Sequence, residues 1–351
     1  MKQQIKTKKS KAVITVVIVI ILTAAVIFFI SDAFYKTDEH FGYAMGSEIV
    51  VVFDSGNNKE IADTLFSRIN NLDTKGISRK SADSEIFALN KNGSYELSEE
   101  ILGYMKQAAD ICDTSGGALD VTIGGLSSLW DFDSSNSILP DITQIETEKS
   151  FCGYEKMTFN GYTVTLGKNQ TVDMGALGKG IACDVAKNVF KENNVKKALL
   201  SVGGTVMTYA DENYSWGNHT WGIAVRTPET GDSSPLLRIN MTENKVISTS
   251  GNYEKFFEEN GILYHHILDP KTGYPVENNL KSVTVISENG LVSDALSTAC
   301  FVLGKEYSSE LLKKYNAQAI FVDKQNNVYI TDDIINSCTI LNDNYRISSY
   351  E

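Results

Sequence analysis

The segment 172-VDMGALGKGIACDVAKNVFKENNVKKALLSVGG-204 says most about the fold. A glycine-rich turn opens it, helical spacing follows over 180–190, and an apolar strand over 198–202 ends in two glycines. Backbone N–H groups in such a turn can approach an anion closely, and the start of a helix adds partial positive charge. Lys179 is therefore a candidate partner for a phosphate oxygen, although a purely structural strand-to-helix turn explains the same residues.

Strands and helices are expected on both sides of this segment. Long helices interleave with mostly adjacent strands, so the sequence predicts an α+β fold with mixed sheets and flanking helices. One compact catalytic domain is expected over 42–333, between a connector at 31–41 and a C-terminal tail at 334–351. Strands are predicted at 47–53, 162–166, 221–226, 236–239, 246–249, 264–268, 282–286, 319–322 and 328–331, and helices at 58–72, 98–113, 292–303 and 306–315.

The N-terminus predicts a membrane anchor. Residues 12–30 carry no charge and would span about 28 Å as a helix, close to the thickness of a bilayer core. The basic segment 1–11 holds five lysines, which places the N-terminus in the cytoplasm and the remaining chain outside the cell membrane. A cleaved signal peptide is the alternative, but its apolar region is usually shorter.

Charge and cysteine content limit the function classes. The chain has 32 basic and 44 acidic residues, and without the five N-terminal lysines its net charge is −17. Such a surface repels phosphate backbones, which argues against a nucleic-acid partner. The five cysteines show no C-x-x-C spacing, so zinc and redox motifs are absent. Buried free thiols are expected, with one disulfide as the alternative.

The stretch S-D-A-L-S-T at 293–298 is a candidate metal site. With Ser293 as the helix cap, Asp294 and Thr298 lie one turn apart on one helix face. A carboxylate and a hydroxyl suit magnesium, which prefers oxygen ligands and retains substrate phosphates and water. A helix cap with an acidic first turn is the simpler interpretation of the same residues.

Two adjacent histidines precede a D-P-x-T-G turn at 269–273. Neighbouring side chains in a strand point to opposite faces, so only one of His265 and His266 is expected to face a cleft. That histidine could act as a base near neutral pH, whereas a surface histidine is the alternative. The glycine- and hydroxyl-rich stretches 203–204, 248–253 and 115–130 could line a pocket or simply form turns.

Taken in order, these stretches resemble the ApbE family of FAD:protein FMN transferases over about 42–333. M-G-S at 45–47 and S-E-I-F-A-L-N at 84–90 match its first motifs. G-G-A-L-D-V-T-I-G-G-L-S-S-L-W at 116–130 and the D-x-G-x-x-x-K-G-x-x-x-D pattern of 173–184 follow. S-T-S-G at 248–251, H-I-L-D-P-K-T-G-Y-P at 266–275 and D-A-L-S-T at 294–298 complete the set.

The resemblance implies magnesium-dependent transfer of FMN from FAD to a threonine or serine hydroxyl of a target protein, with release of AMP. It implies targets that are FMN-binding proteins of membrane or extracytoplasmic electron transfer. Asp294, Thr298 and the carbonyl of Ala176 would bind magnesium, and His266 would assist proton removal. Lys80 stands where many members have an aromatic residue. The implied FAD-contacting positions are Met45, Ala118, Leu119, Asp120, Asp173, Lys179 and Leu268.

Two other functions share these motifs. A magnesium-dependent FAD pyrophosphatase would use water in place of the protein hydroxyl and give FMN and AMP. A non-catalytic, membrane-tethered flavin-binding protein would not need Asp294, Thr298, Lys179 and His266 together. The chain contains no clear acceptor motif, so it is not expected to modify itself.

Overall fold

The computed structural model describes residues 37–134, 137–215, 220–348 and 350. The anchor predicted at 12–30 lies outside these residues. None of the helices in the described part of the chain has the length and apolar character of a membrane span.

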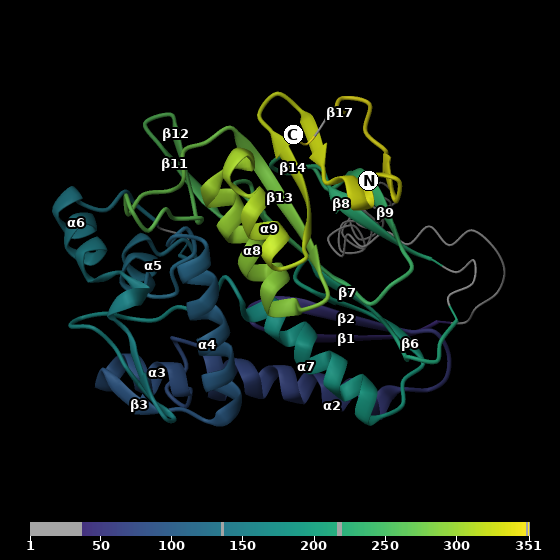
Figure 1. Cartoon of the computed structure of the whole chain (residues 1–351), viewed down its shortest axis with the longest axis horizontal. Helices are drawn as coiled ribbons and strands as arrows, with labels where there is room; N and C mark the ends of the chain where they lie inside the picture. The colour runs from purple at the N-terminus through teal and green to yellow at the C-terminus, as the bar shows by residue number, and fades with distance from the viewer. Residues whose placement is uncertain (1–36, 135–136, 216–219, 349, 351) are drawn as a thin grey trace, which may run out of the picture.

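A nine-stranded sheet forms the centre of the molecule (Figure 1). All neighbouring strands are antiparallel except β15 and β17, which are parallel. In spatial order the strands are β1 (Asp38–Ala44), β2 (Ser47–Phe53), β6 (Lys197–Val202), β7 (Thr205–Ala210), β10 (Val246–Gly251), β13 (Leu280–Ser287), β14 (Gln318–Asp323), β15 (Asn327–Ile330) and β17 (Arg346–Ser348).

The sheet is buried on both faces, because its strands are apolar at successive positions. In β2, Val51 packs into the core on the helical face and Val52 into the core on the other face. The helical face carries α2 (Lys59–Asn71), α7 (Gly178–Glu192), α8 (Gly290–Leu303) and α9 (Ser309–Lys314). The opposite face carries the small sheet of β8 (Trp221–Arg226), β9 (Pro235–Met241) and β16 (Cys338–Ile340).

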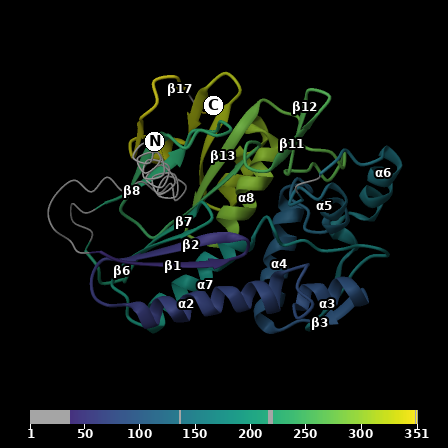
Figure 2. The same cartoon turned by 180° about the vertical axis from the view of Figure 1, so that it is seen from behind.

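A second, mostly helical lobe lies beside one end of the large sheet (Figures 1 and 2). A π-helix (Leu72–Ile77) extends α2 toward this lobe, and the hairpin of β11 (Phe256–Glu259) and β12 (Ile262–His265) packs on it. The lobe contains α3 (Glu85–Asn92), α4 (Glu99–Thr114), α5 (Gly124–Trp130), α6 (Ile142–Phe151) and the sheet β3 (Ser94–Glu96), β5 (Thr163–Thr165) and β4 (Thr158–Asn160). Short 3-10 helices at Tyr154–Lys156 and Lys305–Tyr307 and the four-residue α10 (Asp332–Ile335) complete the structure.

The structure confirms the predicted α+β fold but shifts its edges. β1 begins at Asp38, inside the expected connector, and β16 and β17 lie inside the expected tail. These strands are short or lie at sheet edges, where backbone pairing holds them without an apolar sequence. β12 ends at His265, so the strand expected over 264–268 starts and stops earlier.

All five cysteines are free thiols, which confirms the thiol expectation over the disulfide.

Candidate active site

The starts of α7 and α8 touch, and this contact joins two of the predicted motifs. The backbone N–H of Gly180 donates to Oδ2 of Asp294 across 2.9 Å. Gly180 and Gly290 lie so close that a Cβ on Gly180 would sit 2.0 Å from the carbonyl oxygen of Gly290. The glycine-rich turn and the D-A-L-S-T helix, more than 100 residues apart in sequence, therefore form one site.

The structure corrects the expected cap of α8. Asn289 caps the helix by accepting from Val292 N–H, and the helix begins at Gly290. The Ser293 hydroxyl is buried and instead donates to the carbonyls of Val246 and Val285. Asp294 consequently lies in the second turn and is only 5% exposed, so its carboxylate belongs to the protein interior.

Lys179 lies at the same junction. Its side chain approaches Gly203 in the β6–β7 turn, where a Cβ would be 3.6 Å from Cδ of Lys179. Burial raises the pKa of Asp294, and the Lys179 ammonium and the Gly180 N–H oppose that shift. No carboxylate of the described residues lies within ion-pair distance of Lys179, so its charge is available to an anion.

Met45 approaches the start of α7 from the other side. Met45 and Gly46 both have positive φ, 54° and 68°, and form the two-residue turn between β1 and β2. The Met45 N–H donates to Oδ2 of Asp73 across 3.2 Å, which holds this unusual backbone conformation. Sδ of Met45 would be 3.9 Å from a Cβ on Gly178. The predicted FAD-contacting residue Met45 thus adjoins the glycine-rich turn.

Hydroxyl groups surround Thr298, one turn beyond Asp294. Its Oγ1 lies 3.2 Å from Oγ of Ser250 in β10, and Ser250 also contacts Oγ of Ser297 at 2.8 Å. The S-T-S-G stretch therefore supplies polar contacts to the face of α8 that carries the predicted metal ligands.

The two histidines after β11 have different environments. Nδ1 of His266 lies 3.3 Å from the carbonyl oxygen of Lys255, and since a carbonyl can only accept, Nδ1 carries the hydrogen and donates it in a hydrogen bond. This tautomer leaves the lone pair on Nε2, and desolvation lowers the pKa of His266 to about 4, so the ring is neutral at pH 7. The Lys179 charge contributes to the low pKa, which places both side chains in one electrostatic neighbourhood.

His265 is a buried structural residue. Its Nε2 donates to the Val276 carbonyl across 3.0 Å, and its Nδ1 accepts from the Ile267 N–H across 3.3 Å. The ring also makes an edge contact with Phe301 at 5.7 Å. His265 therefore belongs to the core, and the role of His266 at the site remains a prediction.

Asp173 forms an ion pair that the sequence did not indicate. Nε of Arg79 donates to its Oδ2 across 2.9 Å, while its Oδ1 accepts from Gly175 N–H across 2.8 Å. Nη1 of Arg79 donates to Oγ of Ser128 in α5. Arg79 thereby connects the helical lobe to the glycine-rich turn. In the sequence, the only sign of this role is a positive charge shortly before the S-E-I stretch.

Lys80, which precedes the S-E-I stretch, pairs with Asp133. Its Nζ lies 2.7 Å from Asp133, which also pairs with Lys255 at 2.7 Å. Hydrogen bonds from the two lysines lower the pKa of Asp133. These exposed pairs connect three segments: the loop after the π-helix, the loop after α5 and the start of β11.

The predicted flavin contacts in the helical lobe are packed inside it. Both oxygens of Asp120 accept hydrogen bonds, Oδ1 from Thr122 and Oδ2 from Tyr154 N–H, and burial raises its pKa. Ala118 and Leu119 are buried beside it. The structure thus gives this stretch a loop-organising role and leaves its predicted contact with FAD a prediction.

Leu268 contributes to a small core with Trp130. It forms an isolated bridge with Pro275, and Nε1 of Trp130 donates to the Gly273 carbonyl across 2.9 Å. The D-P-K-T-G turn is therefore fastened to α5, which fixes the segment that follows His266.

The donor set at α8 fits magnesium. Asp294 uses Oδ2 for Gly180 and retains Oδ1, while Thr298 offers a half-buried hydroxyl. Ala176 lies in the turn four residues before Gly180, and the role of its carbonyl as a ligand remains a prediction. Among the described residues no group of three His, Cys, Asp or Glu side chains is placed to hold a metal.

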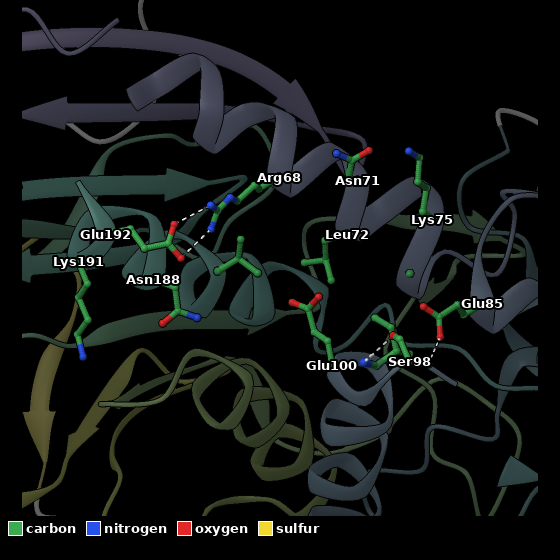
Figure 3. A pocket seen from close by; sticks show the side chains of 13 residues that line it. Arg68, Asn71, Leu72, Lys75, Glu85, Ser98, Glu100, Asn188, Lys191 and Glu192 are labelled. Atoms are coloured by element: carbon green, nitrogen blue, oxygen red, sulfur yellow. Dashed lines mark hydrogen bonds and ion pairs between the residues drawn. The ribbon is translucent and has the colours of Figure 1, made fainter. Parts of the chain in front are cut away.

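A cavity of about 560 Å³ lies elsewhere, between α2, α4 and the C-terminal half of α7 (Figure 3). Within its lining Arg68 pairs with Glu192, and Glu85 accepts from Ser98 N–H. None of the predicted site residues lines it.

Comparisons with known proteins place the chain in a family. The model of the ApbE family matches residues 45–321. An FAD:protein FMN transferase of Treponema pallidum is 29% identical over 262 residues, covering 69% of this chain and 72% of the relative. One from Escherichia coli K12 is 26% identical over 288 residues, covering 79% and 81%.

Solved structures extend the similarity to three dimensions. The crystal structure of the ApbE protein of Thermotoga maritima superposes with a TM-score of 0.76 at 28% identity, covering 86% of this chain and 99% of that one. The flavin transferase ApbE of Vibrio cholerae has the same fold, with a TM-score of 0.73 at 22% identity, covering 85% and 98%. The glycine-rich turn and the D-A-L-S-T helix meet at one junction, and the family model spans most of the chain; this protein belongs to the ApbE family.

Proposed function

We propose that the chain is an FAD:protein FMN transferase that joins FMN to a serine or threonine hydroxyl of another protein and releases AMP. Its family and the names of its curated relatives support the transferase activity. The structural observation that carries the proposal is the hydrogen bond from Gly180 to Asp294, which brings the glycine-rich turn to a buried carboxylate.

The proposed base is His266. The acceptor hydroxyl oxygen would bond to the phosphorus of the FMN half while the bond from that phosphorus to the bridging oxygen breaks. The bridging oxygen leaves with AMP, and the hydroxyl proton passes to Nε2 of His266. The contact of Nδ1 with the Lys255 carbonyl fixes the tautomer and the orientation that this role requires.

The remaining residues would bind and orient FAD. Asp294, Thr298 and the carbonyl of Ala176 would hold Mg²⁺, which when bound would neutralise charge on the pyrophosphate. Lys179 would pair with a phosphate oxygen beside it. FAD contacts are proposed for Met45, Ala118, Leu119, Asp120, Asp173 and Leu268.

The proposed location is the outer face of the cell membrane, with residues 12–30 as an uncleaved anchor and the N-terminus in the cytoplasm. Targets would then be FMN-binding proteins of membrane or extracytoplasmic electron transfer. Protease added to intact cells should remove the catalytic domain. Full protection of the domain would contradict this topology.

The transferase activity is tested by mass spectrometry of candidate exported FMN-binding proteins after incubation with this protein, FAD and Mg²⁺. A serine or threonine carrying FMN, with AMP in solution, is the expected result, and Asp294→Ala provides the negative control. Free FMN and AMP without any modified protein would instead support an FAD pyrophosphatase.

A further inference from the structure

The helices α7 and α8 begin with the same pattern of residues. Each has a glycine followed four positions later by an aspartate: Gly180 and Asp184 in α7, Gly290 and Asp294 in α8. The two glycines face each other at their closest approach, where a Cβ on either would sit 2.0 or 2.1 Å from the carbonyl oxygen of the other. Only glycine at both positions allows the helix starts to touch.

The aspartates exchange hydrogen bonds across this contact. Asp294 of α8 accepts from Gly180 N–H of α7 at 2.9 Å. Asp184 of α7 accepts from Gly290 N–H at 2.8 Å through Oδ1 and from Leu291 N–H at 2.9 Å through Oδ2. Each helix therefore satisfies unpaired N–H groups at the start of the other, where a carboxylate also complements the helix dipole.

The exchange is unequal. Asp184 uses both oxygens on the backbone of α8. Asp294 uses one oxygen and lies near the Lys179 charge. The hydrogen bonds of Asp184 thus hold the start of α8 in place, whereas those of Asp294 leave it able to act as a ligand.

We infer that Asp184 is a positioning residue, which fixes the first turn of α8 so that Asp294 and Thr298 hold the metal at a set distance from Lys179. This inference rests on the proposed magnesium site. A purely structural role would predict lost stability alone, whereas positioning predicts weaker metal binding in a protein that is still folded.

The test is Asp184→Asn, with Mg²⁺ titrated calorimetrically into the FAD-loaded protein and the melting temperature recorded. The amide retains one acceptor oxygen but turns an NH₂ group toward a backbone N–H, so one of the two bonds is lost. Mg²⁺ affinity should fall roughly tenfold, the lower end of the effect of residues that orient metal ligands. Saturating Mg²⁺ should restore most of kcat for FMN transfer.

Asp323 provides the matched control. It is also buried, and its Oδ1 accepts from the N–H groups of Gln325 and Asn327 in the β14–β15 turn, away from the site. Asp323→Asn should lower the melting temperature without changing Mg²⁺ affinity. Should Asp184→Asn fail to fold, Asp184→Glu, with both oxygens on a longer side chain, should show weakened Mg²⁺ binding.

Unchanged Mg²⁺ affinity in a folded Asp184 variant would overturn the inference and leave the magnesium site standing. Absence of Mg²⁺ binding by the unmodified protein would instead remove the magnesium proposal, and this inference with it. The two failures are therefore distinguishable in one set of titrations.

Discussion

Arg79 and Asp173 form an ion pair between segments 94 residues apart, with Nε of the arginine 2.9 Å from Oδ2 of the aspartate. Both side chains are about four-fifths buried, at 18% and 20% exposure. A pair of this kind, unlike an exposed one, restricts the glycine-rich turn that begins at Asp173.

Arg79→Ala should therefore weaken FAD binding. Loss of a partly buried, charge-assisted hydrogen bond costs about 1.5–3 kcal/mol, which corresponds to roughly a tenfold or greater loss of affinity. Flavin fluorescence measures that affinity. Lys80→Ala is the control, because the neighbouring Lys80–Asp133 pair is half-exposed and should contribute little. Equal losses in the two variants would argue against a specific role for Arg79.

His266→Ala should separate binding from transfer. FAD binding depends on the glycine-rich turn and the metal, so affinity should remain near normal, whereas a lost base slows transfer by about 10²–10⁴-fold. The measurements are flavin fluorescence and the rate at which covalent flavin appears on a target protein. Normal transfer would place the base elsewhere, and complete loss of FAD binding would make His266 a pocket residue.

His265→Asn should alter stability in a pH-dependent way. Burial lowers the pKa of His265 to about 4 from an ordinary value of 6.5, so the unfolded chain takes up a proton first as the pH falls. The stabilising effect of the neutral ring is complete above pH 6.5 and is lost toward pH 4, by up to about 3 kcal/mol.

Urea unfolding from pH 7.5 to pH 4.5 checks this prediction. The stability difference between the unmodified protein and His265→Asn should shrink as the pH falls. A constant difference over that range would show that His265 has the same pKa in the folded and the unfolded protein.

Asp294→Ala should abolish metal-dependent transfer and also lower stability. Its buried carboxylate satisfies the Gly180 N–H, and leaving that group unpaired costs about 1–3 kcal/mol. Thr298→Ala should reduce transfer less, since water can replace a neutral ligand. Transfer rates with and without EDTA, beside melting temperatures, distinguish these effects, and full activity of Asp294→Ala would disprove the site.

The sequence predicted several interior elements, because their patterns reflect burial, but it missed β7, a buried strand between β6 and β10. The strand over 47–53 matches β2, and the helix over 292–303 lies within α8. The edge strands β1, β16 and β17 were missed, since pairing with a neighbour determines them more than composition does. The π-helix after α2 was also missed, because its residues continue a helical pattern.

The site was predicted in outline through motifs but not in its supporting contacts. Ser293 was expected at a cap and lies in the core, because Asn289, four residues earlier, satisfies the helix start. Asp184 and Arg79 act through partners about a hundred residues away, at Gly290 and Asp173. No local pattern specifies such a partner, so only the folded chain reveals it.

The early start of β1 limits how far the enzyme can reach. Under the proposed topology, seven residues (31–37) separate the anchor from the first strand of the catalytic unit. At about 3.3–3.6 Å per residue, this linker can extend to roughly 25 Å at most. The catalytic unit would stay close to the bilayer surface, and a protein that receives flavin would have to bring its hydroxyl close to that surface.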